Sequence, residues 1–218
     1  MTPGRRVRRG VALAVVALAA LGMAACAGTP AAGGADPAAP ANGASAASAA
    51  AAVAATALPL VNPGFEADPV AGPADVPGWV ATQHAGDRSH LFTLDAATKH
   101  GGARSLRIDN VGVEPYGAVM QVVDARAVAG RKVRFSAWLA TRDASGDGAS
   151  LMIVAEGSRI LAHDAMAGAE LKGTRGWARQ SVEIALPPAT TQLRVGIVLQ
   201  GKGTLWVDDA ALEIVDAR

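Results

Sequence analysis

Two segments of the chain alternate core-forming and other residues with a period of two. In Val133–Leu139 the odd-numbered positions hold Val, Phe, Ala and Leu, and the even-numbered positions hold Arg, Ser and Trp. In Leu193–Gln200 the odd-numbered positions hold Leu, Val, Ile and Leu, between Arg, Gly, Val and Gln. Successive side chains of a strand point to opposite faces, so this pattern buries one face and leaves the other partly polar. It is typical of an antiparallel sheet in a β-sandwich.

Further strands are predicted where apolar runs lie between clusters of Gly, Asp, Ser and Pro, which form turns. The predicted strands cover 119–123, 132–141, 149–156, 178–186, 192–200 and 204–215, the last with a break at its aspartates. The segment 143–148 is interpreted as a hairpin loop, and 163–172 as the best candidate for one short helix. Several short strands separated by turns predict an all-β fold, a two-sheet antiparallel sandwich, and not a βαβ fold.

The N-terminus has the form of an export signal. Four arginines precede a short apolar core, Val11–Leu21, that is shorter than a membrane span. Small residues then lead to Cys26, the only cysteine of the sequence, and Met23-Ala24-Ala25-Cys26 resembles the lipobox of bacterial lipoproteins. The resemblance implies cleavage before Cys26 and attachment of diacylglycerol to its thiol. The alternative is an ordinary apolar cysteine inside a signal that is cut elsewhere.

The composition after Cys26 separates a tether from a domain. Residues 27–57 are almost entirely Ala, Gly, Pro and Ser, which cannot bury enough apolar surface to offset the entropy of ordering. We therefore predict a signal peptide over 1–25, an acylated Cys26 with a disordered tether over 26–57, and one domain over 58–218. Without the four arginines of the signal, 16 Lys and Arg remain of 20, against 19 Asp and Glu, a net charge of −3. Such a chain lacks the basic footprint of a nucleic-acid-binding protein.

Short motifs are distributed over nearly the whole predicted domain. They are Asn62-Pro63-Gly64-Phe65-Glu66, Gly78-Trp79, the run His100–Ile108, Phe135-Ser136-Ala137-Trp138, Gly176-Trp177, and Gly201–Asp209 before a final apolar strand. Their order resembles the jelly-roll carbohydrate-binding modules of bacterial cellulases and xylanases, within the galactose-binding-like fold. The resemblance implies a jelly-roll sandwich that binds carbohydrate and does not catalyse a reaction.

Catalytic motifs do not stand out in the sequence. It contains no Gly-x-Ser-x-Gly elbow, phosphate loop or dinucleotide fingerprint, and its four histidines lack the spacing of a zinc protease. Asp208 and Asp209 are adjacent carboxylates, but neighbouring strand residues point to opposite faces, so the pair is poorly placed to flank one glycosidic bond. We therefore expect a protein that is not an enzyme.

A sugar-binding surface needs an aromatic ring against the C–H face of a pyranose, with polar side chains that hydrogen-bond its hydroxyls. Trp138 beside Arg134, on the polar side of one predicted strand, has that composition. Further polar groups would come from Gln121, Glu156, Arg194 and Gln200 if their strands share the sheet, with Tyr116 at the rim. The alternative for Trp138 is structural packing, which we expect of Trp79, Trp177 and Trp206.

The resemblance also implies a structural calcium near the joined ends of the sandwich. Glu66 and Asp208 stand at the matching positions, and backbone carbonyls around His100–Gly102 would complete an oxygen shell of the kind that calcium prefers. The alternative is that both carboxylates cap turns by accepting hydrogen bonds from backbone amides. No other cofactor is expected.

Together these observations predict a non-catalytic envelope lipoprotein that binds carbohydrate through a jelly-roll module. The first alternative is a structural or interaction lipoprotein that binds another envelope protein, and the second is a weak glycan hydrolase. The predicted partners are a carbohydrate or an envelope protein, and a membrane through the lipid anchor. Because Ala27, not aspartate, follows Cys26, the outer membrane is the expected location if the cell has one.

Overall fold

The computed structural model describes residues 56–72 and 75–215, and these form a β-structure. Its strands are β1 (Thr56–Leu58), β2 (Val80–Gln83), β3 (His90–Asp95), β4 (Ser105–Asn110), β5 (Tyr116–Asp124), β6 (Lys132–Glu156), β7 (Ile160–Asp164), β8 (Leu171–Ala185), β9 (Gln192–Gln200) and β10 (Gly203–Ile214). One 3-10 turn, η1 (Arg126–Val128), lies between β5 and β6. Cys26, the predicted signal and nearly all of the predicted tether lie outside the described residues.

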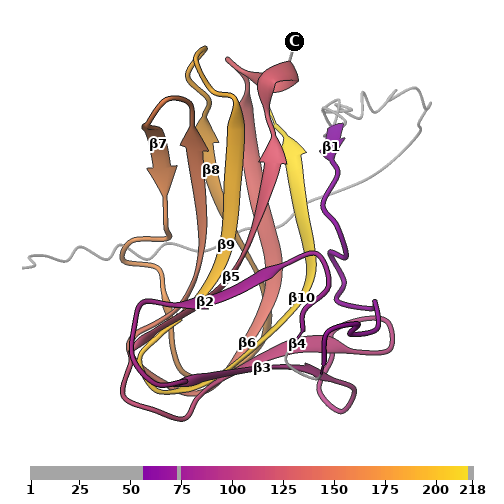
Figure 1. The fold of residues 1–218 in the computed structure, drawn as a ribbon, viewed down its shortest axis with the longest axis vertical. Coiled ribbons are helices and arrows are strands. Elements are labelled where there is room, and N and C mark those ends of the chain that lie inside the picture. The colour runs from indigo at the N-terminus through magenta and orange to yellow at the C-terminus, as the bar shows by residue number, and fades with distance from the viewer. Residues whose placement is uncertain (1–55, 73–74, 216–218) are drawn as a thin grey trace, which may run out of the picture. The chain divides into compact units, whose positions relative to one another are not determined.

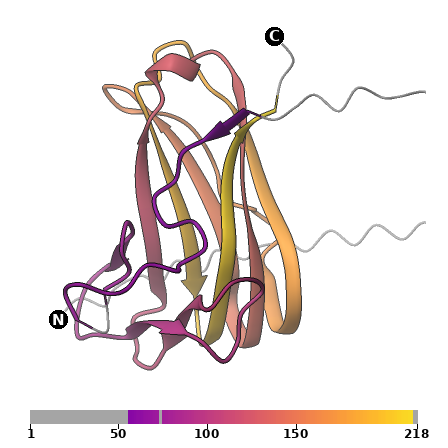
Figure 2. The ribbon, with the colours of Figure 1, turned by 90° about the vertical axis from the view of Figure 1, so that its right-hand side faces the viewer.

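The strands form two layers, which share the long strand β6 (Figure 1). The first sheet has the order β8-β6-β10-β4-β3, with β1 paired to the end of β10 (Figure 2). The second sheet has the order β2-β5-β9-β6-β7. All strand pairs are antiparallel. The two-sheet antiparallel sandwich predicted from the alternating segments is therefore confirmed.

The strand β6 passes from one sheet to the other without reversing. Its residues 133–142 pair with β10, whereas residues 148–156 pair with β9. Between them the pairing with β8 shifts register, and Asp143, Gly146 and Gly148 have positive φ. The predicted hairpin loop over 143–148 is therefore wrong. The glycines and aspartates of this segment form bulges that turn the strand instead of ending it, because a bulge uses the same left-handed conformations as a tight turn.

The predicted short helix over 163–172 is also wrong. Residues 160–164 form β7, and His163 pairs with Val154 of β6. A turn with positive φ at Met166 and Gly168 then leads into β8. Within the described ranges, no helix has both the length and the hydropathy of a membrane span.

The core lies between the two sheets and follows the predicted alternation. Val133, Phe135, Ala137 and Leu139 of β6 are fully buried, as are the four apolar odd-numbered residues of β9. Trp79 packs in this core against Phe65, with ring centroids 5.4 Å apart, and its indole N–H donates to the carbonyl of Asn62. The structural role expected for Trp79 is confirmed by these contacts.

Candidate functional site

The predicted ligand residues are divided between the outer faces of the two sheets. Trp138 and Arg134 lie on the outer face of the first sheet, in the part of β6 that pairs with β8 and β10. The remaining residues belong to the second sheet, and all except one point outward from it; they are Tyr116, Glu156, Arg194 and Gln200. The predicted surface is therefore two surfaces, and the strand pairing decides which side chains belong together.

Gln121 is the exception because it points inward, on the same side of β5 as buried Val119. Its amide N–H groups donate to the carbonyls of Val61 and Gly78, and its amide oxygen accepts from the N–H of Val61. Three hydrogen bonds thus tie the segment before β2 to the sheet. The amide of Gln121 therefore has a structural role, because its hydrogen bonds go to the backbone. The residue also borders a hollow described below.

We call the outward residues of β5, β9 and the second half of β6 the Tyr116 face. Its first hollow has a volume of about 250 Å³ and lies beside Tyr116. Polar groups line it at Asp147, Ser150, Glu170 and Gln200. The side-chain amide of Gln200 donates to the carboxylate of Asp147 at 2.7 Å. The hollow therefore presents hydrogen-bonding groups beside an aromatic ring.

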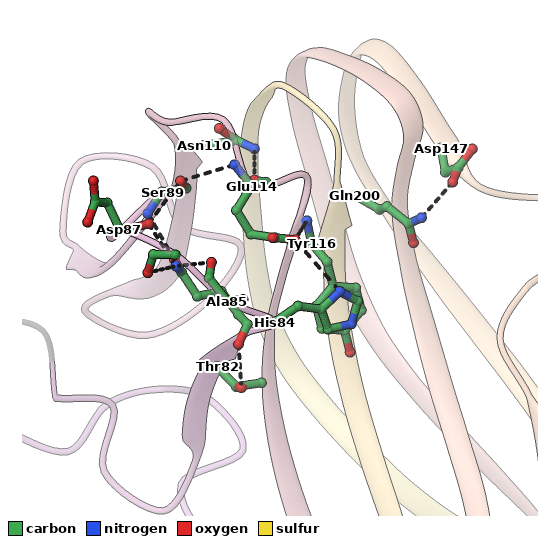
Figure 3. A network of polar contacts seen from close by, with 12 residues as sticks. Thr82, His84, Ala85, Asp87, Ser89, Asn110, Glu114, Tyr116, Asp147 and Gln200 are labelled. Atoms are coloured by element: carbon green, nitrogen blue, oxygen red, sulfur yellow. Dashed lines mark hydrogen bonds and ion pairs between the residues drawn. The ribbon is translucent and has the colours of Figure 1, made fainter. Parts of the chain in front are cut away.

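The ring of Tyr116 is held in place at the end of β5. The imidazole of His84 stacks on it, with ring centroids 4.1 Å apart and planes 3° from parallel (Figure 3). Glu114 lies beside both rings: its carboxylate accepts from the backbone N–H of Tyr116 and is 3.7 Å from Nδ1 of His84. Burial raises the pKa of the Tyr116 hydroxyl, although the charge of Arg194 opposes the shift. The phenol is therefore protonated at neutral pH and able to donate a hydrogen bond.

A second hollow, of about 510 Å³, lies further along the same face. It is bordered by Val80 of β2 and Val122 of β5, which are 69% and 55% exposed, and by Arg194. The guanidinium of Arg194 pairs with the carboxylate of Glu156 at 2.7 Å, and the amide of Gln192 donates to the same carboxylate. Glu156 and Arg194, both predicted from the sequence, thus meet on one surface.

The outer face of the first sheet carries a different cluster around Trp138. The imidazole of His100 stacks on Trp138 at 3.9 Å between ring centroids, and Trp177 meets His100 edge-on. Nδ1 of His100 lies 2.7 Å from a carboxylate oxygen of Asp209. Beside this cluster, Arg134 pairs with Glu183. The polar groups here satisfy one another, and one face of the Trp138 ring is covered.

Trp206 lies on the same sheet but is buried. The guanidinium groups of Arg107 and Arg142 lie 5.7 and 5.1 Å from its ring centroid, and its indole N–H donates to Asp95. These contacts agree with the structural role expected for Trp206. Trp177 is partly exposed beside His100.

The two carboxylates considered as calcium ligands accept hydrogen bonds from the loop between β3 and β4. Asp208 accepts from the backbone N–H groups of His100, Gly101 and Asp209, and Glu66 accepts from that of Ala103. Burial raises the pKa of Asp208, and these amide donors oppose the shift. Amide donors occupy both carboxylate oxygens of Asp208 and one of Glu66, so the donor set of the described residues fits capping better than metal ligation. Nor do three His, Cys, Asp or Glu side chains gather as metal ligands within the described ranges. Calcium binding stays a prediction.

Several residues beside Tyr116 were not predicted to belong to the site, including His84, Glu114 and Asp147. His84 and Glu114 lie in loops, where no periodic pattern assigns a face. Asp147 was assigned to a loop by its composition, yet it lies in β6 and reaches Gln200 across the strand pair. A strand residue whose partner is 53 positions away leaves no local signal.

Sequence comparison finds one distant relative and no matching family. No family model matches the chain. Over 147 residues it is 25% identical to an uncharacterized HTH-type transcriptional regulator, YbfP, of Bacillus subtilis (strain 168). The match covers 64% of this chain and 48% of that protein, so the chain spans about half the length of this curated relative.

Structure comparison finds the same fold in proteins of different activity. A Stig cyclase from Fischerella sp. TAU superposes with a TM-score of 0.57 and 14% identity, over 75% of this chain and 100% of the cyclase. A family 16 carbohydrate-binding module superposes with a TM-score of 0.52 and 12% identity, over 70% of this chain and 97% of the module. At these identities the likeness concerns the fold alone, and the described domain is a jelly-roll β-sandwich of the kind found in carbohydrate-binding modules.

Proposed function

We propose that this domain binds carbohydrate on the Tyr116 face, without transforming it. The observation that carries the proposal is the hollow in which the ring of Tyr116 stands beside Asp147, Ser150 and Gln200. An aromatic ring next to acceptors and donors suits a sugar, whose C–H face packs on the ring while its hydroxyls form hydrogen bonds. The fold shared with a family 16 carbohydrate-binding module supports this proposal.

The Tyr116 face is favoured over the Trp138 cluster because its groups are better placed for a ligand. Tyr116 is stacked by His84 but still lines the hollow. On the other sheet, His100 covers one face of Trp138, and Arg134 is held by Glu183. A sugar that binds there meets an arginine already held by an ion pair, whereas the polar groups described in the first hollow are joined by the hydrogen bond from Gln200 to Asp147.

Calorimetric titration with a panel of oligosaccharides tests the proposal. We expect Tyr116→Ala to weaken binding by about thirtyfold, the equivalent of about 2 kcal/mol for a central aromatic contact. The matched control is Trp138→Phe, which changes an aromatic residue on the other sheet and should leave the affinity unchanged. Melting curves of both variants exclude unfolding as the cause. Binding that survives Tyr116→Ala but is lost in Trp138→Ala would move the site to the first sheet.

A protein partner is the second candidate, and exposed apolar residues favour it. Val61, Val80 and Val122 are 62%, 69% and 55% exposed, and all three border the second hollow. Clustered exposed apolar side chains are typical of surfaces that contact another protein. If no sugar of the panel binds and an envelope protein is captured by the wild type but not by Val122→Asp, this second function replaces the first.

We further propose that the protein is exported and held in the cell envelope by acyl chains on Cys26. The sequence motif before Cys26 and the Ala-, Gly-, Pro- and Ser-rich composition of residues 27–57 support this location. A tether of about thirty residues has a mean span of about 30 Å as a flexible coil. The binding face could then reach a glycan or a protein partner at some distance from the membrane, which for a cell with two membranes we propose to be the outer one.

A further inference from the structure

His90 is a buried side chain whose polar atoms the fold leaves without partners. It is 2% exposed, and neither ring nitrogen has a hydrogen-bond partner among the residues that the structure describes. A buried polar group without a partner destabilises the fold, because it has lost its hydrogen bonds to water and gained none in return. Burial lowers the pKa of His90, which makes the ring neutral near pH 7. A neutral imidazole offers one donor and one acceptor.

The ring borders a cavity at the open edge of the sandwich. This cavity, of about 310 Å³, lies between edge strand β2 of the second sheet and edge strand β3 of the first. Its lining comprises Ala81–Gln83, Gly86, Arg88, His90 and Phe92. His90 points inward from β3, as Phe92 does, and its ring packs against Gly117 of β5. The volume suits one small molecule, not a polymer.

The loop between β2 and β3 holds the mouth of this cavity in a fixed shape. The side-chain amide of Gln83 donates to the carbonyls of Ala85 and Asp87 and accepts from the N–H of Ser89. The hydroxyl of Ser89 in turn accepts from the N–H of Glu114. A loop braced in this way presents its remaining side chains without a large ordering cost on binding.

Arg88 supplies the charge of the cavity. It lies on the braced loop, is exposed, and forms no ion pair or hydrogen bond with any residue in the described ranges. The acidic neighbours Asp87 and Glu114 border a separate hollow with Val113 and Pro115. The charge of Glu114 raises the pKa of His90, and the charge of Lys202 lowers it. The free guanidinium is therefore the charged group that a ligand would meet in the cavity.

We propose that this edge cavity binds a small hydroxylated carboxylate, of the size of one sugar acid. The fork of Arg88 matches a carboxylate, which accepts two parallel hydrogen bonds. A ring nitrogen of His90 pairs with one hydroxyl of the ligand, as donor or as acceptor. The ring of Phe92 contacts the apolar side of the ligand. This site is separate from the Tyr116 face and does not depend on the function proposed for that face.

Titration of the full chain with D-glucuronate, observed through the imidazole nitrogen resonances of labelled histidine, tests the site. We expect a saturable shift of the His90 resonances, and affinities for D-glucose and acetate at least about tenfold weaker. The variant Arg88→Gln should weaken D-glucuronate binding by about tenfold or more, since it removes the charged fork. Arg159→Gln, at another exposed arginine, is the matched control and should bind as the wild type does.

Each other result overturns a stated part of the proposal. Unmoved His90 resonances at tens of millimolar D-glucuronate would leave His90 a packing residue. Equal binding of D-glucose would remove the carboxylate from the assignment, and equal binding of acetate would remove the hydroxyls. Binding that Arg88→Gln does not weaken would place the anion elsewhere. Because Tyr116→Ala leaves this cavity intact, its effect on oligosaccharide binding is measured independently.

Discussion

At the scale of single residues, the contact between His90 and Gly117 gives a sharp test of packing. A Cβ at position 117 would lie 2.2 Å from Cδ2 of His90, closer than any tolerated contact. We expect Gly117→Ala to lower the free energy of unfolding by about 1–3 kcal/mol, as overpacking of a core does. Urea denaturation measures the change.

The double variant Gly117→Ala with His90→Ala is the control for this clash. Because the shortened side chain leaves room for the new methyl group, the loss from Gly117→Ala should be much smaller in the His90→Ala background. Strictly additive losses would mean that the ring of His90 does not press on Gly117, and would also weaken the position assigned to His90 in the edge cavity.

The sequence predicts single residues well only where a pattern assigns their face. The alternation in 193–200 placed Arg194 and Gln200 outward, and the structure agrees. Around Gln121 the apolar residues run without alternation, so nothing in the sequence showed that its amide faces inward to Val61. Alternation also separates inside from outside without saying which sheet a strand joins, which is why Trp138 and Tyr116 were grouped together.

At the scale of elements, β6 explains both the success and the failure of the strand assignment. Residues 132–141 and 149–156 were correctly assigned to strands because the first segment alternates and the second is mostly apolar. The linking segment has the composition of a tight turn, and composition alone cannot distinguish a reversal of the chain from a series of bulges. The distinction depends on β8, β9 and β10, which pair with different parts of β6.

The bulged segment of β6 predicts a large cost for a single methyl group. Gly148 has a φ of +84°, and a Cβ there would lie 2.5 Å from the backbone oxygen of Leu171. We expect Gly148→Ala to lower the free energy of unfolding by about 2 kcal/mol or more, since backbone strain and a clash with main chain add. The matched control is Gly176→Ala, where no heavy atom lies within 4 Å of the new Cβ. Equal denaturation midpoints of the two variants would contradict a rigid passage between the sheets.

At the scale of the whole molecule, the two proposed sites lie on different parts of one sandwich. The Tyr116 face belongs to the outer side of the second sheet, whereas the His90 cavity opens at the edge where β2 and β3 end the two sheets. A sandwich offers both kinds of surface because its two sheets satisfy their backbone hydrogen bonds internally and leave side chains free to vary. This is why the fold was predictable from the alternating strands and the ligand was not.

The membrane anchor gives a test that involves the whole chain and no part of the binding surfaces. We expect wild-type protein from cell extracts to partition into the detergent phase on phase separation, and Cys26→Ser to stay in the aqueous phase. The reason is that each buried acyl methylene contributes about 0.8 kcal/mol, and more than one chain makes the attachment stable. Mass spectrometry of the mature N-terminus should find acyl chains on Cys26 of the wild type. An unmodified Cys26 thiol, or equal partitioning of the two proteins, would contradict the anchor while leaving the carbohydrate proposal to be judged by Tyr116→Ala.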